Sequence, residues 1–220
     1  RVRATQKLIA NCHSPISLKP IWVNSFNEVS LDEYNDISKY KVFSTNIDMQ
    51  TINWHKDYVS GYEYPLKMHY HINISKQFDK GIDVKFPWEV SRFYFGVQFA
   101  KNYRITKNDK YYTDYKSLIL SWIEYNPYCI GVNWVCTMEV SIRAINWIVS
   151  LNMFGEKFHK DLVFIKKLSI SLQQHAEYIS SFPEIYKLNG ITHSGNHTTA
   201  GNAGLLFLSI TLKNSEHSNS

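Results

Sequence analysis

The chain has 220 residues, of which 44% are hydrophobic and 15% aromatic, enough to build a sizeable core. Lys and Arg outnumber Asp and Glu by 24 to 19, a formal net charge of +5 that is mild beside the basic stripes of nucleic-acid binders. The composition therefore excludes a disordered chain and predicts no nucleic-acid partner. It favours an acidic glycan or another polyanion, and the abundant Tyr and Trp suit either sugar rings or core packing.

The cysteines Cys12, Cys129 and Cys136 are odd in number, which argues against a disulfide framework. No apolar run approaches the roughly 20 residues of a membrane span, so no membrane partner is expected. The first residues lack the apolar stretch of a secretory signal. Because the chain begins without Met and ends in a polar run just after a helix, we expect a fragment of a longer protein.

Residues 1–50 form a mixed segment, with a short helix expected over residues 3–11, a strand-like piece over 17–23 and an irregular polar stretch over 32–47. Residues 51–83 are rich in aromatic side chains and show no sustained period. We expect this second stretch to be an ordered arm that lies over the helices.

Helical spacing of apolar residues begins at residue 83. It predicts helices over residues 83–103, 108–125, 134–154 and 160–182, and from about 197 onward. Pro87 suits a first turn, and Pro127 and Pro183 follow helix ends. Helices of similar length with no alternating strand indicate a mostly α fold of antiparallel helical hairpins, as in an α/α toroid or solenoid.

A polar pair, Asn196 and His197, opens the last predicted helix after the flexible run 189–195. Thr198 and Thr199 follow in the first turn, where such residues can satisfy free backbone N–H groups. A helix end is a plausible place to hold an amide and an imidazole for chemistry.

Small residues follow this pair at Gly201, Ala203 and Gly204, before the apolar run 205–208. Residues with almost no side chain allow two helices to approach closely. We therefore expect this helix to pack tightly on its neighbours and to form a rigid base under the polar pair.

The third predicted helix bears Glu139, Arg143, Asn146 and Ser150 at intervals of four, three and four residues, so they share one face. One interpretation is a solvated face with an ion pair between residues four apart, worth a few tenths of a kcal/mol. The other is the wall of a groove that recognises a charged polymer.

A second polar set invites the same two interpretations. Glu89 and Arg92 lie beside Trp88 near the start of the first predicted helix.

His69 and His71, with His55 nearby, raise the possibility of a metal site. The spacing is not specific and no acidic or Cys partner completes a ligand set, so no metal is predicted. We expect His159 and His175 to be helix-surface or packed residues. No phosphate loop, nucleophile elbow or Cys-x-x-Cys is present, and nucleotide chemistry and serine hydrolysis are unsupported.

Three motifs in order resemble the N-terminal helical domain of the heparinase II/III-like polysaccharide lyases. They are FPWEVSRF at 86–93, NP at 126–127 followed by GVNWVCTMEVSIRAINW at 131–147, and NH at 196–197 with AGLLF at 203–207. The resemblance covers about residues 52–212, and we identify no such motif in residues 1–50.

The resemblance implies an incomplete α/α toroid over residues 51–220, here truncated and preceded by an irregular N-terminal arm over residues 1–50. In family members a β-sandwich domain follows the toroid, and these enzymes cleave uronic-acid-containing polysaccharide by β-elimination. The implied partner is an acidic polysaccharide, and the implied location is periplasmic or secreted. No cofactor is implied.

The resemblance also assigns roles to residues. Asn196 matches the amide that neutralises the uronate carboxylate, and His197 would assist it. The Tyr and second His that transfer protons would lie beyond Ser220, so the chain alone is expected to lack lyase activity. The expected substrate-binding neighbours are Trp88, Arg92, Trp134, Glu139, Arg143 and Asn146.

Two other functions stay open. One is a non-catalytic glycan-binding or scaffold protein on the same toroid. The other, a helical-toroid glycoside hydrolase, needs two facing carboxylates, for which Glu89 and Glu139 are candidates. Each has an Arg three or four residues later, which makes a poor general acid.

Overall fold

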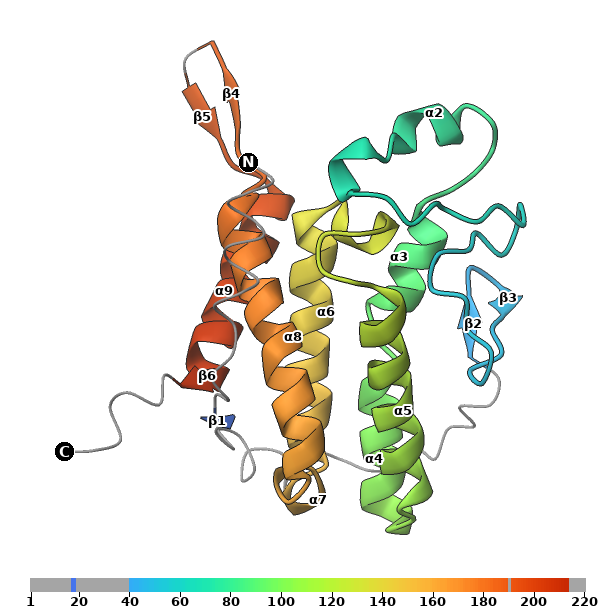
Figure 1. Ribbon diagram of the computed structural model, residues 1–220, viewed down its shortest axis with the longest axis vertical. Coiled ribbons are helices and arrows are strands. Elements are labelled where there is room, and N and C mark those ends of the chain that lie inside the picture. The colour runs from blue at the N-terminus through green and yellow to red at the C-terminus, as the bar shows by residue number, and fades with distance from the viewer. Residues whose placement is uncertain (1–16, 19–39, 190, 214–220) are drawn as a thin grey trace, which may run out of the picture.

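The computed structural model describes residues 17–18, 40–189 and 191–213 (Figure 1). In this part of the chain the fold is mostly helical, as the sequence predicts, with long helices packed side by side and short strand pairs at the periphery (Figure 1). Closure of these helices into a toroid stays a prediction. None of the described helices is both long and apolar enough to cross a membrane.

The helical elements are η2 (His69–His71), α2 (Ile74–Phe78), α3 (Lys85–Ser91), α4 (Gly96–Thr106), α5 (Lys110–Tyr125), η3 (Val132–Trp134), α6 (Thr137–Met153), α7 (Glu156–His159), α8 (Leu162–Ser181) and α9 (Asn196–Thr211). The strands are β1 (Ser17–Leu18), β2 (Lys41–Val42), β3 (Thr45–Asn46), β4 (Tyr186–Leu188), β5 (Ile191–His193) and β6 (Leu212–Lys213). They pair antiparallel as β1 with β6, β2 with β3, and β4 with β5.

Four of the predicted helices are confirmed as α5, α6, α8 and α9. The helix predicted over residues 3–11 lies outside the described residues, as does most of the strand-like piece, of which residues 17–18 form β1. The arm over residues 51–83 contains η2 and α2. Val42 and Ile47, which precede the expected domain boundary at residue 51, are buried in the same core as the helices.

The single helix predicted over residues 83–103 is wrong, because the chain breaks there into α3 and α4. Phe93 lies at the break with a left-handed backbone, φ 60°. Its buried ring stacks on Trp54 at a centroid distance of 5.2 Å and meets Trp147 edge-on at 5.3 Å. Burial of such a ring contributes about 1.5–3 kcal/mol, which offsets a backbone strain of about 1–3 kcal/mol.

A charged group lies at the centre of the aromatic core. Arg143 of α6 is fully buried, with its guanidinium carbon 4.0 Å from the ring centroid of Trp122 and 5.3 Å from that of Trp134. Its Nε donates to Nε2 of His175 (2.9 Å), and its Nη1 donates to the carbonyl of Asn133 (3.4 Å). Burial lowers the pKa of Arg143 to about 9, so the guanidinium is still charged at neutral pH.

His175 of α8 is packed in this core, one of the two environments expected for it. Its Nδ1 lies 2.6 Å from the carbonyl of Ser171, which can only accept, so Nδ1 bears the proton and Nε2 is free to accept from Arg143. Burial, together with the charge of Arg143, holds the pKa of His175 well below its ordinary value. The core therefore needs this histidine neutral.

Helix α9 approaches α6 unusually closely at Gly204. A Cβ atom at this position would lie 2.7 Å from Cβ of Ser141 on α6, whereas one at Gly201 would be 3.8 Å from its nearest neighbour, on Ile179. The expected tight packing is therefore confirmed at Gly204. Because of it, α6 and α9 lie side by side and both begin at the end of the molecule that bears the β4–β5 hairpin (Figure 1).

Gly204→Ala is expected to lower the free energy of unfolding by about 1–3 kcal/mol, because the added methyl overlaps Ser141. Gly201→Ala is the matched control in the same helix. Position 201 has room for the methyl, and alanine avoids the cost of about 1 kcal/mol that glycine has inside a helix. The Gly201→Ala variant should therefore be as stable as the unsubstituted protein or more stable. Urea denaturation of the two variants measures the difference, and equal losses would contradict the close contact.

The buried histidine predicts a loss of stability in acid. Below pH about 6.5 the unfolded chain binds a proton at His175 that the folded chain does not. The free energy of unfolding therefore decreases as the pH is lowered, by up to about 1.4 kcal/mol per pH unit. His175→Gln, whose amide oxygen can still accept from Arg143, should make this dependence shallower by about one proton. Denaturation at several pH values tests this; an unchanged slope would contradict it. His55, His69 and His159, whose pKa values burial also lowers, contribute equally to both proteins.

Candidate functional site

The first turn of α9 places the predicted pair at the surface. Asn196 is exposed, and the helix is preceded by Gly195, which has no side chain to cap the first N–H groups. Uncapped N–H groups at the start of a helix of this length attract anions, because they combine with the positive end of the helix dipole. The amide of Asn196 adds two further donors at this position.

His197 is held by a carboxylate from another segment. Its Nδ1 lies 2.9 Å from Oε2 of Glu184, in the link between α8 and β4. The same Oε2 accepts from the backbone N–H of Met138 in the first turn of α6 (3.1 Å). The hydroxyl of Thr198 donates to the backbone carbonyl of Glu184 (2.7 Å). Glu184 therefore ties the start of α6 to the start of α9 and fixes the ring of His197.

Cys136 completes this cluster. It directly precedes α6 and is 4% exposed, with its Sγ 3.7 Å from Oε2 of Glu184 and 3.8 Å from Nδ1 of His197. Burial raises the pKa of the Cys136 thiol to about 12, so the thiol is protonated at neutral pH and can donate to Glu184. A cavity of about 100 Å³ opens beside Glu184, His197 and Asn202.

Thr198 and Thr199 do not play the role expected of them. Their hydroxyl groups donate to carbonyls, that of Thr198 to Glu184 and that of Thr199 to Gly195 (3.2 Å), and do not accept from free N–H groups. The reason is their position, because both lie inside the helix and the residue at its cap is Gly195.

Arg92 lies in a dense ion network between α3 and α6. Its Nε and Nη2 donate to the two carboxylate oxygens of Glu139, each at 2.6 Å, and its Nη1 donates to Glu89, also at 2.6 Å. Asn146 donates to the backbone carbonyl of Arg92 (2.7 Å), and the indole N–H of Trp88 donates to the carbonyl of Val132 (2.9 Å). Arg92 thus pairs with both Glu89 and Glu139. Neither carboxylate is therefore free to act as the acid of a hydrolase.

The polar face of α6 is largely inside the protein. Glu139, Arg143 and Ser150 are all buried, so its interpretation as a solvated face is wrong, and Glu139 pairs with Arg92 in place of the expected partner Arg143. Trp134 is also fully buried. Trp134 and Arg143 therefore offer no surface to a ligand in this structure, although they support the segment that leads to Cys136.

The histidines of the arm have separate partners. His55 Nε2 lies 2.9 Å from the carbonyl of Tyr125, and His69 Nδ1 lies 3.0 Å from the hydroxyl of Tyr178.

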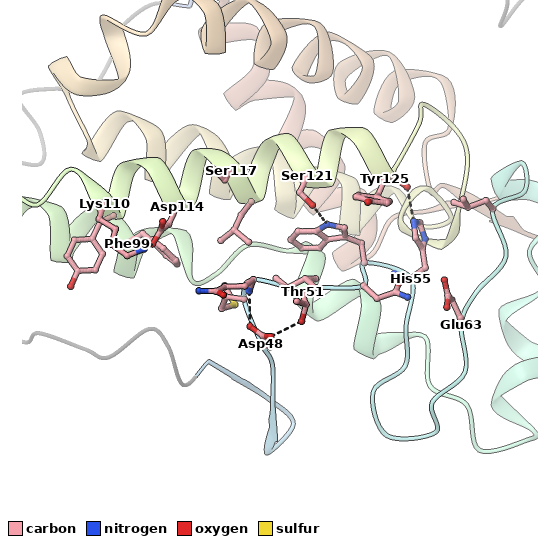
Figure 2. A pocket seen from close by; sticks show the side chains of 18 of the residues that line it. Asp48, Thr51, His55, Glu63, Phe99, Lys110, Asp114, Ser117, Ser121 and Tyr125 are labelled. Atoms are coloured by element: carbon pink, nitrogen blue, oxygen red, sulfur yellow. Dashed lines mark hydrogen bonds and ion pairs between the residues drawn. The ribbon is translucent and has the colours of Figure 1, made fainter.

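A larger cavity, of about 1150 Å³, lies between α5 and the segment 48–66 (Figure 2). Its lining includes the carboxylates of Asp48, Glu63 and Asp114, and its Lys110 is paired with Asp114 at 2.6 Å. Such an acidic lining repels a polyanion. In Figure 1, α6 and α8 lie between α5 and α9, so this cavity is remote from the predicted pair. The start of α9 is the better candidate for an acidic ligand.

Sequence reasoning missed Glu184 and Cys136. The small-residue stripe of α9 predicts a close helix neighbour but does not identify it. The pairing of α9 with α6 brings Cys136 to His197, and the link after α8 brings Glu184.

Comparison with known proteins gives one family. The model described as Heparinase II/III N-terminus matches residues 24–214, which includes part of the segment 1–50 where we identify no motif. Searches of curated proteins and of solved structures found no match to the chain. The family match spans most of the sequence and its range includes the motifs around Trp88, Trp134 and Asn196, and this protein therefore belongs to the heparinase II/III N-terminal family.

Proposed function

We propose that the chain is the substrate-binding part of a polysaccharide lyase that cleaves uronic-acid-containing polysaccharide by β-elimination. The observation that supports this most directly is the exposed amide of Asn196 at the uncapped start of α9, beside a His197 that Glu184 orients. Membership of the heparinase II/III family supports the same reaction class.

The chemistry explains the need for such a site. The C5 proton of a uronate is hard to remove while the neighbouring carboxylate bears its full charge, because the resulting enolate-like intermediate gathers further negative charge. Donors placed around the carboxylate stabilise that charge as it develops. The amide of Asn196 and the first N–H groups of α9 are donors of this kind. With Nδ1 of His197 bound to Glu184, Nε2 on the opposite side of the ring is left for the sugar.

The other half of the reaction is proposed to lie outside this site. The proposal includes a Tyr and a His that move protons, and a β-sandwich domain. It also includes closure of the helices into a toroid and a periplasmic or secreted location. Under it, the 220-residue chain alone binds the polymer without cleaving it.

A non-catalytic glycan-binding protein is the second candidate. One observation favours it: the donors at the start of α9, the exposed amide of Asn196 and the uncapped N–H groups, can bind an acidic sugar without any proton transfer.

Asn196→Ala in the full-length protein is expected to lower kcat by about 10²–10³-fold, because one donor to the developing charge is lost. The polymer Kd should change by only a few-fold. Absorbance of the new C4=C5 double bond on a panel of uronate polymers measures turnover. Ser209→Ala, exposed near the other end of α9, is the control and should leave both quantities unchanged.

The outcomes separate the two candidates. Equal loss of binding and turnover in Asn196→Ala would assign Asn196 to binding alone. A full-length protein that binds a uronate polymer and never generates the absorbance would favour the non-catalytic function. Product formed by the 220-residue chain itself would contradict the division of the site between two parts.

A further inference from the structure

Three side chains with different metal-binding atoms meet at the starts of α6 and α9. They are the thiol of Cys136, the carboxylate of Glu184 and the imidazole of His197, and their ligand atoms lie within 4.8 Å of one another. Each comes from a different segment: the residue before α6, the link after α8, and the first turn of α9. We propose that these three residues bind a divalent metal ion of the zinc class.

The separations fit a tetrahedral ion. Zinc bonds of about 2.3 Å to sulfur and about 2.1 Å to nitrogen or oxygen place the ligand atoms of a tetrahedral site about 3.6 Å apart for pairs with sulfur and about 3.4 Å apart for the nitrogen–oxygen pair. The Sγ atom of Cys136 lies 3.7 Å from Oε2 of Glu184 and 3.8 Å from Nδ1 of His197. Nδ1 and Oε2 are 2.9 Å apart, because they share a hydrogen bond, and need to separate by about 0.5 Å to admit the ion.

The charges also balance. A thiolate, a carboxylate and a neutral imidazole carry two negative charges in total, which a divalent ion cancels in this partly buried position. Binding displaces the thiol proton to solvent. The N-terminal ends of α6 and α9 face the cluster and favour its two anionic ligands.

The surroundings hold the ligands in place and leave one side open. Met138 N–H donates to Oε2 of Glu184, and Thr198 fixes the backbone of the same residue. Partners of this kind orient metal ligands and raise affinity. The cavity of about 100 Å³ borders Glu184 and His197, which gives a fourth coordination position room for water. Three protein ligands with an open fourth position is the arrangement of a reactive metal site.

The test needs no polysaccharide, so it stands apart from the proposed lyase activity. The chain is stripped with a chelator and titrated with Co²⁺ while its visible spectrum and its thiolate-to-cobalt charge-transfer band are recorded. We expect one Co²⁺ per chain, a charge-transfer band from one thiolate, and displacement of Co²⁺ by Zn²⁺.

Variants identify the ligands. Cys136→Ser should remove the charge-transfer band, and Glu184→Gln and His197→Ala should each weaken binding at least about tenfold. Cys129→Ala is the matched control, because Cys129 is also a buried free cysteine but lies outside the cluster, and it should keep the band. Far-ultraviolet circular dichroism checks that each variant folds. If Cys136→Ser fails to fold, Glu184→Gln still tests the site, because it alters only a partly exposed side chain.

Two results would overturn the proposal. One is the absence of any cobalt–thiolate band in the reduced wild-type chain, which would leave Glu184 and His197 as a plain hydrogen-bonded pair. The other is a band that survives Cys136→Ser.

Discussion

The close contact between α6 and α9 at Ser141 and Gly204 is the constraint on which the candidate site depends. Helices normally lie 8–10 Å apart, and only a residue without a side chain permits the approach seen here. The contact sets α9 beside α6 with both helices starting at the same end of the molecule (Figure 1). Because of that, Cys136 before α6 and His197 in α9 can reach the same carboxylate, that of Glu184.

The rigidity of this base comes from a core that is polar as well as aromatic. Arg143 is stacked against Trp122 and bonded to His175, so among the described residues its charge is held inside the core by aromatic rings and neutral acceptors. Nearer the candidate site, Arg92 binds two carboxylates and joins α3 to α6. The geometry around Arg143 is strict, since a buried guanidinium that loses a partner is costly, and that around Arg92 is fixed by its two-pronged pairing with Glu139. Both networks are suited to hold the start of α6 in one place.

Some of the residues that the family resemblance places near a substrate lie in these networks. Trp134 and Arg143 are sealed in the core, and Glu139 is occupied by Arg92. Asn196 is exposed and His197 is partly exposed. The large acidic cavity along α5 is the bigger hollow, yet its charge does not match a polyanion (Figure 2). The start of α9 is the better candidate site for an acidic ligand because of its charge and its hydrogen-bond donors, although the cavity along α5 has the larger volume.

The sequence by itself determined the helical class, most helix positions, the tight packing of α9 and the family, because apolar periodicity, proline and glycine positions and short motifs are local signals. It also singled out Asn196 and His197. Only the tertiary structure decided the break at Phe93, where aromatic packing from distant residues overrides the helical pattern. The same holds for the pairing of Glu139 with Arg92 and for the meeting of Cys136, Glu184 and His197, since both depend on which helices lie side by side, and no local pattern encodes that choice.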